Sequence, residues 1–272
     1  MATERIVRYY TRTAAQYRRV WSPDHLHYGY WDRRAWTHRE SLNRMVEVLA
    51  DTAGIRPGEF VLDAGCGVGG SARWLARHRR ARVLGISITP AQVAEAEKRS
   101  RHFSDVSFMV ADYLDTGLPG ASVDVVWALE SACYAPGTAK AEFLREAYRI
   151  LRPGGRLVMA DGFTRRPPRT REEREALLAF CDAWALPTLG VWPEVLAEAE
   201  RIGFEIRTAR DITRHVLPSA VRLLVLHLGF TPFAWLLSDE ERRNWLGAYW
   251  QWRVFRTVGM YGLLLAVKPH ER

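Results

Sequence analysis

Residues 61–70 read Val-Leu-Asp-Ala-Gly-Cys-Gly-Val-Gly-Gly, and this stretch decides the fold. The apolar run 60–62 leads into Asp63 and a glycine-rich turn, and a helical pattern covers residues 71–79. This order is typical of a buried parallel strand that is followed directly by a helix. The turn contains Gly65, Gly67 and Gly69. Glycines let a ligand lie against the backbone, and the start of the helix offers free N–H groups to it.

Several ligands fit a glycine turn of this kind. A dinucleotide needs an acidic residue about 20 residues later for its ribose, and a P-loop needs a Gly-Lys-Ser/Thr ending that this turn lacks. S-adenosylmethionine has no phosphate, and a carboxylate such as Asp63 can face its amino and sulfonium charges. A turn with a purely structural role is the remaining alternative.

Strands and helices alternate along the chain. We predict strands at 60–62, 82–87, 106–110, 123–129, 156–160, 204–209 and 261–267, and helices at 71–79, 90–99, 139–151, 171–184 and 193–202, with a helical insert at 213–257. This alternation predicts an α/β fold with a doubly wound, mostly parallel sheet. Polar residues follow the strand ends, where such sheets bind their ligands.

Five segments carry a resemblance to class I S-adenosylmethionine-dependent methyltransferases. They are the stretch 61–70, Gly-Ile-Ser-Ile-Thr-Pro-Ala-Gln (85–92), Ala-Asp-Tyr (111–113), Leu-Glu-Ser (129–131) and Leu-Arg-Pro-Gly-Gly-Arg-Leu (151–157). The similarity covers about residues 9–162 and is greatest to the small-molecule branch, which contains sterol, tocopherol and natural-product methyltransferases. It implies a Rossmann-like, seven-stranded sheet whose last strand runs antiparallel beside the fifth.

The resemblance and the sequence pattern together predict five regions. These are an N-terminal helical, aromatic lid (1–40), an S-adenosylmethionine-binding core (41–163), a helical cap segment with the end of the core (164–212), a helical C-terminal insert on the substrate side (213–258), and the last strand and tail (259–272).

The resemblance also implies which residues bind S-adenosylmethionine and its product S-adenosylhomocysteine. The methionine and ribose parts would be lined by Asp63, Gly65, Gly67 and Gly69, and the ribose would also be bound by Ser87 and Gln92. The adenine would lie beside Asp112 and Tyr113. The remaining residues of the predicted site are Tyr10, Tyr17 and Glu130. Many relatives have an acidic residue at the position of Ser87, and its absence argues against a dinucleotide. For Asp112, a turn-forming role is the alternative.

Aromatic residues are dense both before the sheet and in the insert. We predict substrate contacts from His27, Tyr30, Trp31, Trp245 and Trp250, in a chamber for a hydrophobic small molecule. The alternatives are a helix packed on the sheet at the N-terminus and a simply buried helix in the insert. His25 and His27 have no third partner at metal-ligand spacing, so we expect no metal site.

The chemistry is predicted to depend on Glu130, Asp161 and Tyr134. Methyltransferases of this type that act on oxygen often have a histidine shortly after the Glu-Ser pair, and Glu130-Ser131-Ala132-Cys133-Tyr134 contains none. Methylation of an alkene carbon forms a carbocation, which aromatic faces and a carboxylate stabilise before a base removes a proton. Carbon is therefore favoured as the acceptor, with cyclisation left open. There are two alternatives: the enzyme methylates oxygen or nitrogen, or the protein binds the cofactor without catalysis. For Glu130 and Asp161, purely structural roles also stay open.

Composition limits the remaining function classes. The chain has 272 residues, a net charge of +8 and three cysteines without disulfide or metal spacing, which favours a reducing, cytoplasmic location. Its arginines are scattered and no RNA-binding signature is present, so we expect no nucleic-acid partner. Peripheral membrane contact of the apolar stretch 216–237 and a homo-oligomer are both left open.

Overall fold

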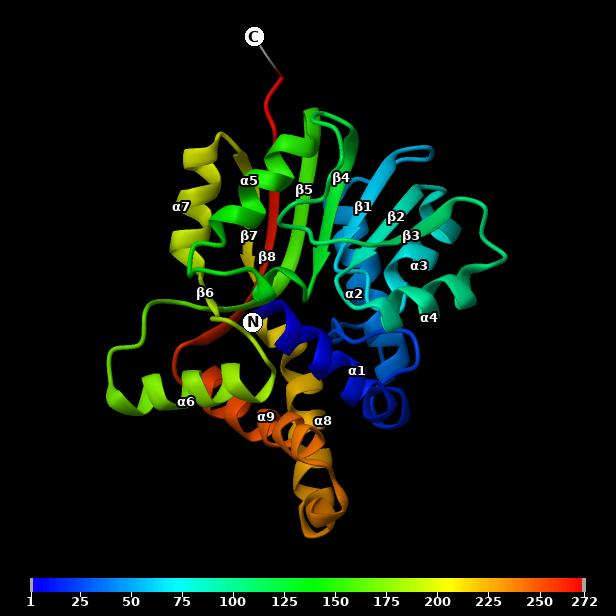
Figure 1. Ribbon diagram of the computed structural model, residues 1–272. Helices are drawn as coiled ribbons and strands as arrows, with labels where there is room; N and C mark the ends of the chain where they lie inside the picture. The colour runs from blue at the N-terminus through cyan, green and yellow to red at the C-terminus, as the bar shows by residue number, and fades with distance from the viewer. Residues whose placement is uncertain (1, 271–272) are drawn as a thin grey trace.

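A single mixed sheet forms the centre of the chain in the computed structural model, which describes residues 2–270 (Figure 1). Its strands are β1 (Phe60–Ala64), β2 (Arg82–Ser87), β3 (Val106–Val110), β4 (Val123–Leu129), β5 (Leu151–Thr164), β6 (Gly190–Val191), β7 (Glu205–Asp211) and β8 (Gly259–Val267). Seven of them lie in the order β3-β2-β1-β4-β5-β8-β7, and the short β6 pairs with β5. β1 to β5 are parallel, whereas β8 is antiparallel to both β5 and β7. The predicted seven-stranded sheet, with its last strand beside the fifth, is confirmed.

Helices cover both faces of this sheet, and a separate group of helices lies at one end of it (Figure 1). The helices are α1 (Ala2–Val20), α2 (His38–Ala53), α3 (Gly70–Arg79), α4 (Pro90–Ser100), α5 (Ala141–Ile150), α6 (Arg171–Ala183), α7 (Trp192–Ile202), α8 (Thr213–Phe230) and α9 (Asp239–Phe255), with the short 3-10 helices η1 (Ala132–Tyr134) and η2 (Thr231–Leu236). The group at the end consists of α1, α6, α8 and α9, and it faces the carboxyl ends of the parallel strands. This arrangement leaves the glycine-rich turn opposite the N-terminal and C-terminal helices.

The core surrounds β4, whose side chains are buried on both faces of the sheet. Val125 and Trp127 pack on one face with α2 and α3, and Val126 and Ala128 pack on the other with α5 and α7. This explains the nearly continuous apolar sequence of the strand, which is characteristic of parallel sheets covered on both sides.

Two boundaries and one additional helix differ from the sequence prediction for identifiable reasons. β5 begins at Leu151 rather than 156, because the turn that follows α5 pairs with the C-terminal segment: the Gly154 N–H donates to the Lys268 carbonyl at 2.8 Å. α5 begins at residue 141, since Lys140 adopts a left-handed φ of 55°. α2 was not predicted, although Thr37 and Glu40 form a capping box at its start.

No helix among residues 2–270 is both long and apolar enough to cross a membrane.

Candidate functional site

A cavity of about 310 Å³ lies between the carboxyl ends of the parallel strands and the helices α1, α6, α8 and α9. It brings together residues from almost the full length of the chain, from Thr3 to Tyr261. Of the residues predicted from sequence, its wall contains Tyr10, Tyr17, His27, Gly65, Ser87, Gln92, Asp112, Tyr113, Glu130, Tyr134, Asp161 and Trp245. Most of the predicted donor-binding and catalytic residues therefore meet at one place.

The glycine-rich turn reaches this cavity through Gly65. Its φ is 101°, and a Cβ built on it would lie 2.3 Å from the Cβ of Ser131. Gly67 and Gly69 also have positive φ, but they lie outside the cavity wall. Gly69 serves packing instead, because a Cβ there would lie 2.6 Å from the ring of Phe108 on β3. Only the first glycine of the turn borders the cavity directly.

Asp63 lies behind the cavity rather than in its wall. Its side chain is buried, and its Oδ2 has no hydrogen-bond partner among the described residues. Burial raises the pKa of this carboxyl group to about 7. Two further buried oxygens, Thr89 Oγ1 and Ser131 Oγ, are also without a partner among the residues described, and both residues lie in the wall. Unpaired buried polar groups are costly, so this region suits a polar ligand with hydrogen-bonding groups of its own.

Two predicted contacts lie side by side at the end of β2. The Ser87 hydroxyl donates to Gln92 Oε1 at 2.9 Å and accepts from the Thr89 N–H at 3.1 Å. After β3, Asp112 accepts from the Leu114 N–H at 2.9 Å, as expected for a turn former, and it still borders the cavity. The geometry is therefore compatible with both interpretations of Asp112.

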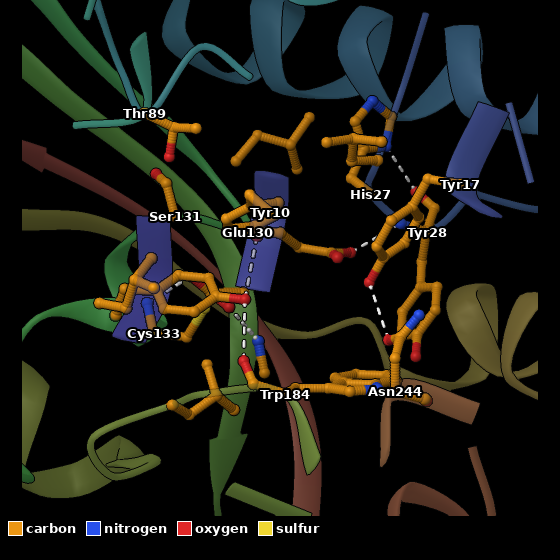
Figure 2. Close-up of a pocket in the computed structure, with 18 of the residues that line it drawn as sticks. Tyr10, Tyr17, His27, Tyr28, Thr89, Glu130, Ser131, Cys133, Trp184 and Asn244 are labelled. Atoms are coloured by element: carbon orange, nitrogen blue, oxygen red, sulfur yellow. Dashed lines mark hydrogen bonds between the residues drawn. The ribbon is translucent and has the colours of Figure 1, made fainter. Parts of the chain in front are cut away.

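Glu130 ends β4 in a left-handed conformation with a φ of 50°, which is rare for a residue with a side chain. Its Oε1 accepts two hydrogen bonds, from the Tyr28 N–H and from the Tyr261 hydroxyl, both at 2.7 Å. No hydrogen bond to its Oε2 is found within the described part of the chain. Burial raises the pKa of Glu130 to about 8, because it disfavours the charged form more than the two donors favour it. Figure 2 shows the side chain extending towards Tyr28.

Asp161 is held by backbone groups. Its Oδ2 accepts from the Cys133 N–H at 2.9 Å and its Oδ1 from the Gly162 N–H at 2.8 Å. Burial raises its pKa to about 6. These contacts favour the structural role that the sequence left open, because the carboxylate fixes the η1 turn to the end of β5.

Tyr134 lies on that turn and faces α1. Its hydroxyl accepts from Tyr10 at 2.9 Å and donates to the Trp184 carbonyl at 3.2 Å (Figure 2). The turn is also held by Lys140, which sequence analysis missed. The fully buried Nζ of Lys140 donates to the carbonyls of Cys133 (3.1 Å), Ala135 (2.7 Å) and Thr188 (2.9 Å). No sequence signal distinguishes Lys140 from an exposed lysine at the start of a helix.

The N-terminal helix α1 closes one side of the cavity. Tyr9 and Tyr17 share a hydrogen bond of 2.7 Å between their hydroxyls, and Tyr9 donates to Asn244 Oδ1 on α9 at 2.6 Å. α1 packs against α9 and α4. Its main packing partners are therefore helices, while Tyr17 also packs against the hydrophobic core that includes Val61 and Val83 of the sheet.

Three of the residues predicted to contact the substrate lie outside the cavity wall. Tyr30 stacks on His215 with ring centroids 4.1 Å apart, Trp31 donates from Nε1 to Ser219 Oγ at 2.9 Å, and Trp250 packs against Tyr249. Each ring anchors the loop or helices around the cavity rather than bordering it. Sequence reasoning missed several wall residues that take their place, namely Tyr28, Phe180, Trp184, Leu223 and Phe255.

The histidines near the cavity are paired with each other. His27 Nε2 lies 3.1 Å from His25 Nδ1, and His27 Nδ1 lies 2.9 Å from the Tyr28 carbonyl. Burial lowers both pKa values, that of His25 to about 4, so both rings are neutral at pH 7. Within residues 2–270, no group of three or more His, Cys, Asp or Glu side chains could hold a metal ion.

Comparison with known proteins identifies the family. Residues 62–159 match the model of a methyltransferase domain. The 27-O-demethylrifamycin SV methyltransferase of Amycolatopsis mediterranei is 34% identical over 208 residues, which are 72% of this chain and 72% of that protein. The chain belongs to the class I S-adenosylmethionine-dependent methyltransferases. The predicted S-adenosylmethionine cofactor is thereby confirmed, and the dinucleotide and P-loop alternatives are excluded.

Other relatives of this methyltransferase act on different acceptor atoms. The 24-methylenesterol C-methyltransferase 2 of Arabidopsis thaliana is 29% identical over 181 residues, which are 65% of this chain and 50% of that protein. A cyclopropane synthase from Mycobacterium tuberculosis shares the fold, with a TM-score of 0.83 at 18% identity over 98% of both chains. The predicted relation to sterol, tocopherol and natural-product methyltransferases is confirmed.

Proposed function

We propose that this methyltransferase transfers a methyl group to a carbon atom of a hydrophobic small molecule in isoprenoid or natural-product biosynthesis. The observation that carries the proposal is the cavity wall, where apolar and aromatic side chains surround the Glu130 carboxyl group, whose Oε2 accepts no hydrogen bond among the described residues. The two histidines of the wall are engaged with each other and with backbone.

The proposed donor site is the half of the cavity next to the sheet. There, Gly65, Ser87, Gln92, Asp112 and Tyr113 would hold S-adenosylmethionine, and the bound cofactor supplies an activated methyl group. Gly65 has no Cβ, so the turn can pack directly against Ser131, and Ser131 and Thr89 offer oxygens without a partner among the described residues. For the three residues outside the cavity wall we propose indirect roles. Gly67 and Gly69 would shape the turn, and Asp63 would place a carboxyl group close to it.

The proposed acceptor site is the half next to the helices. Tyr10, Tyr17 and Tyr134 would exclude water and present ring faces, while His27 and Trp245 would contact the substrate. In the reaction, the alkene π electrons form the new carbon–carbon bond as the carbon–sulfur bond breaks, which leaves a carbocation. Glu130, in the ionised form that a neighbouring positive charge favours, would stabilise this cation and accept the proton that it loses. Asp161 is proposed to position Cys133 and the η1 turn.

We propose that the five regions predicted from the sequence have separate roles. Residues 1–40 would act as the lid, 41–163 as the donor-binding core, 164–212 as the cap segment with the end of the core, 213–258 as the substrate-side insert, and 259–272 as last strand and tail.

We also propose a cytoplasmic location, since Cys66, Cys133 and Cys181 are free thiols.

The test is methyl transfer from labelled S-adenosylmethionine to a panel of alkene-bearing isoprenoids, phenols, macrocyclic alcohols and amines. We expect the label on carbon, located by NMR of the product. Label found only on oxygen or nitrogen would overturn the carbon acceptor and favour the alternative that the rifamycin-type relative suggests. Glu130→Gln should lower the turnover on carbon more than donor binding.

A further inference from the structure

Helix α8 presents two apolar faces in different directions. Its inner face holds the buried Val216 and Ala220, and Leu223 on the same helix borders the cavity. Its outer face exposes Leu217 and Val221 by 40% each, Val225 by 61% and Leu228 by 62%. The spacing of these four residues, i, i+4, i+8 and i+11, places them on one side of the helix.

Two further exposed apolar side chains follow the end of α8. In η2, Trp235 is 74% exposed and Leu236 is 60% exposed. Figure 1 shows that the end of α8, η2 and the start of α9 project away from the rest of the molecule. We call the six residues Leu217, Val221, Val225, Leu228, Trp235 and Leu236 the outer α8 face. Exposed apolar side chains that are concentrated on a projecting element mark an interaction site.

Exposed arginines lie on α8 and on the neighbouring helix α9. They are Arg214, Arg222, Arg242 and Arg243. Of the acidic residues at the start of α9, Glu240 pairs with Arg12, Glu241 belongs to the capping box of Ser238 and forms no ion pair with the described residues, and Asp239 is exposed. From α8 to α9 the chain therefore combines exposed apolar side chains, an exposed tryptophan and more arginines than acidic residues. This is the composition of helices that lie in the headgroup region of anionic bilayers.

We propose that the outer α8 face docks this methyltransferase on the surface of an anionic lipid bilayer. The apolar residues enter the boundary between headgroups and acyl chains, and the arginines meet lipid phosphates. The opposite side of the same helix borders the cavity, so docking places the cavity beside a phase in which an apolar substrate dissolves. The substrate part of this inference depends on the proposed function, whereas the docking itself does not.

The test is co-sedimentation of the full chain with vesicles of phosphatidylcholine alone and of phosphatidylcholine with phosphatidylglycerol. We expect binding to the anionic vesicles that is at least about tenfold tighter than to the neutral ones. Val225→Asp and Leu228→Asp should each weaken vesicle binding about tenfold or more. The double variant Arg242→Gln/Arg243→Gln should weaken it about tenfold or more, and on the anionic vesicles only.

Leu178→Asp is the matched control, because Leu178 is 70% exposed on α6, outside the outer α8 face. It should bind vesicles like the unmodified chain. Binding of S-adenosylhomocysteine, measured by titration for every variant, checks that each is folded. A chain that binds S-adenosylhomocysteine but no vesicles overturns the docking, and a chain that binds vesicles without S-adenosylhomocysteine overturns the donor site alone. A dimer in solution that Val225→Asp dissociates, together with equal vesicle binding by all variants, would assign the outer α8 face to a second copy of the chain instead.

Discussion

The Tyr261 hydroxyl and Glu130 Oε1 lie 2.7 Å apart, although the strand β5 separates their own strands, β8 and β4. The Tyr28 N–H donates to the same oxygen from the loop after α1. One oxygen of the carboxyl group is thus held from two distant parts of the chain, and the other accepts no hydrogen bond among the described residues. This geometry orients a carboxylate that the proposed mechanism uses as a proton acceptor.

Removing the Tyr261 hydroxyl should raise the pKa of Glu130 further above 8, since this hydrogen bond favours the charged carboxylate. For Tyr261→Phe, we expect an upward displacement of about one pH unit, which corresponds to the loss of one charge-assisted hydrogen bond. The titration of the Glu130 side-chain carbon, followed by NMR on glutamate-labelled protein, measures it. An unchanged or lower pKa would show that the hydroxyl does not donate to Glu130.

Glu130 should also make the ligand-free protein less stable as the pH rises. The folded state keeps the Glu130 proton up to about pH 8, whereas the ordinary pKa of the group is 4.5. The folded state therefore binds more protons between these values, and its free energy of unfolding falls from about pH 5 to pH 8. Asp63 and Asp161 contribute with the same sign, since their pKa values are also raised, to about 7 and about 6.

Glu130→Gln should remove part of this fall. Its amide oxygen can still accept from Tyr28 and Tyr261, so the geometry is retained without the titration. Urea unfolding at pH 5, 6, 7 and 8 measures the slope. A slope equal to that of the unmodified protein would contradict the raised pKa of Glu130.

Gly65→Ala should abolish donor binding. The added Cβ would lie 2.3 Å from the Ser131 Cβ, and alanine is also strained at a φ of 101°. Gly117→Ala is the control, because Gly117 has a φ of 68° with nothing within 4 Å of its Cβ, and it lies outside the cavity wall. We expect titration with S-adenosylhomocysteine to show no binding for Gly65→Ala and unchanged binding for Gly117→Ala. Equal affinities would remove the turn from the donor site.

Lys140→Met should destabilise the protein by about 3 kcal/mol or more, since it leaves three buried carbonyls without their shared donor. Because those carbonyls hold the η1 turn and the loop at Thr188, donor affinity should fall as well. Lys98→Met on the exposed side of α4 should change stability by less than about 0.5 kcal/mol. Urea unfolding of both variants makes the comparison. Equal stability would mean that the turn is held by its other contacts.

The sequence predicted the sheet closely because local patterns determine its strands. Three strands have the predicted bounds, namely 82–87, 106–110 and 123–129. This is expected for short apolar runs bounded by turn signals. Glycine positions and strand-end polar residues likewise placed Gly65, Ser87, Asp112 and Glu130 at one edge of the sheet.

The half of the cavity next to the helices was harder to predict, because it depends on how helices far apart in sequence pack together. Trp31 and Trp250 carry the same aromatic signal as Tyr28 and Trp184, yet only the second pair reaches the cavity. Which side of a loop or helix faces inward is decided by partners such as Ser219 and Asn244, and no local pattern reveals these partners.

Asn244 joins the first helix to the last, since its Oδ1 accepts from Tyr9 and its Nδ2 donates to Gln16 at 2.7 Å. The pocket is thus incomplete until residues near position 10 meet residues near position 245. During synthesis, this enclosure can form only after residue 245 has left the ribosome. A ligand captured inside contacts both α1 and α9, so its affinity adds directly to the resistance of the folded chain to unfolding.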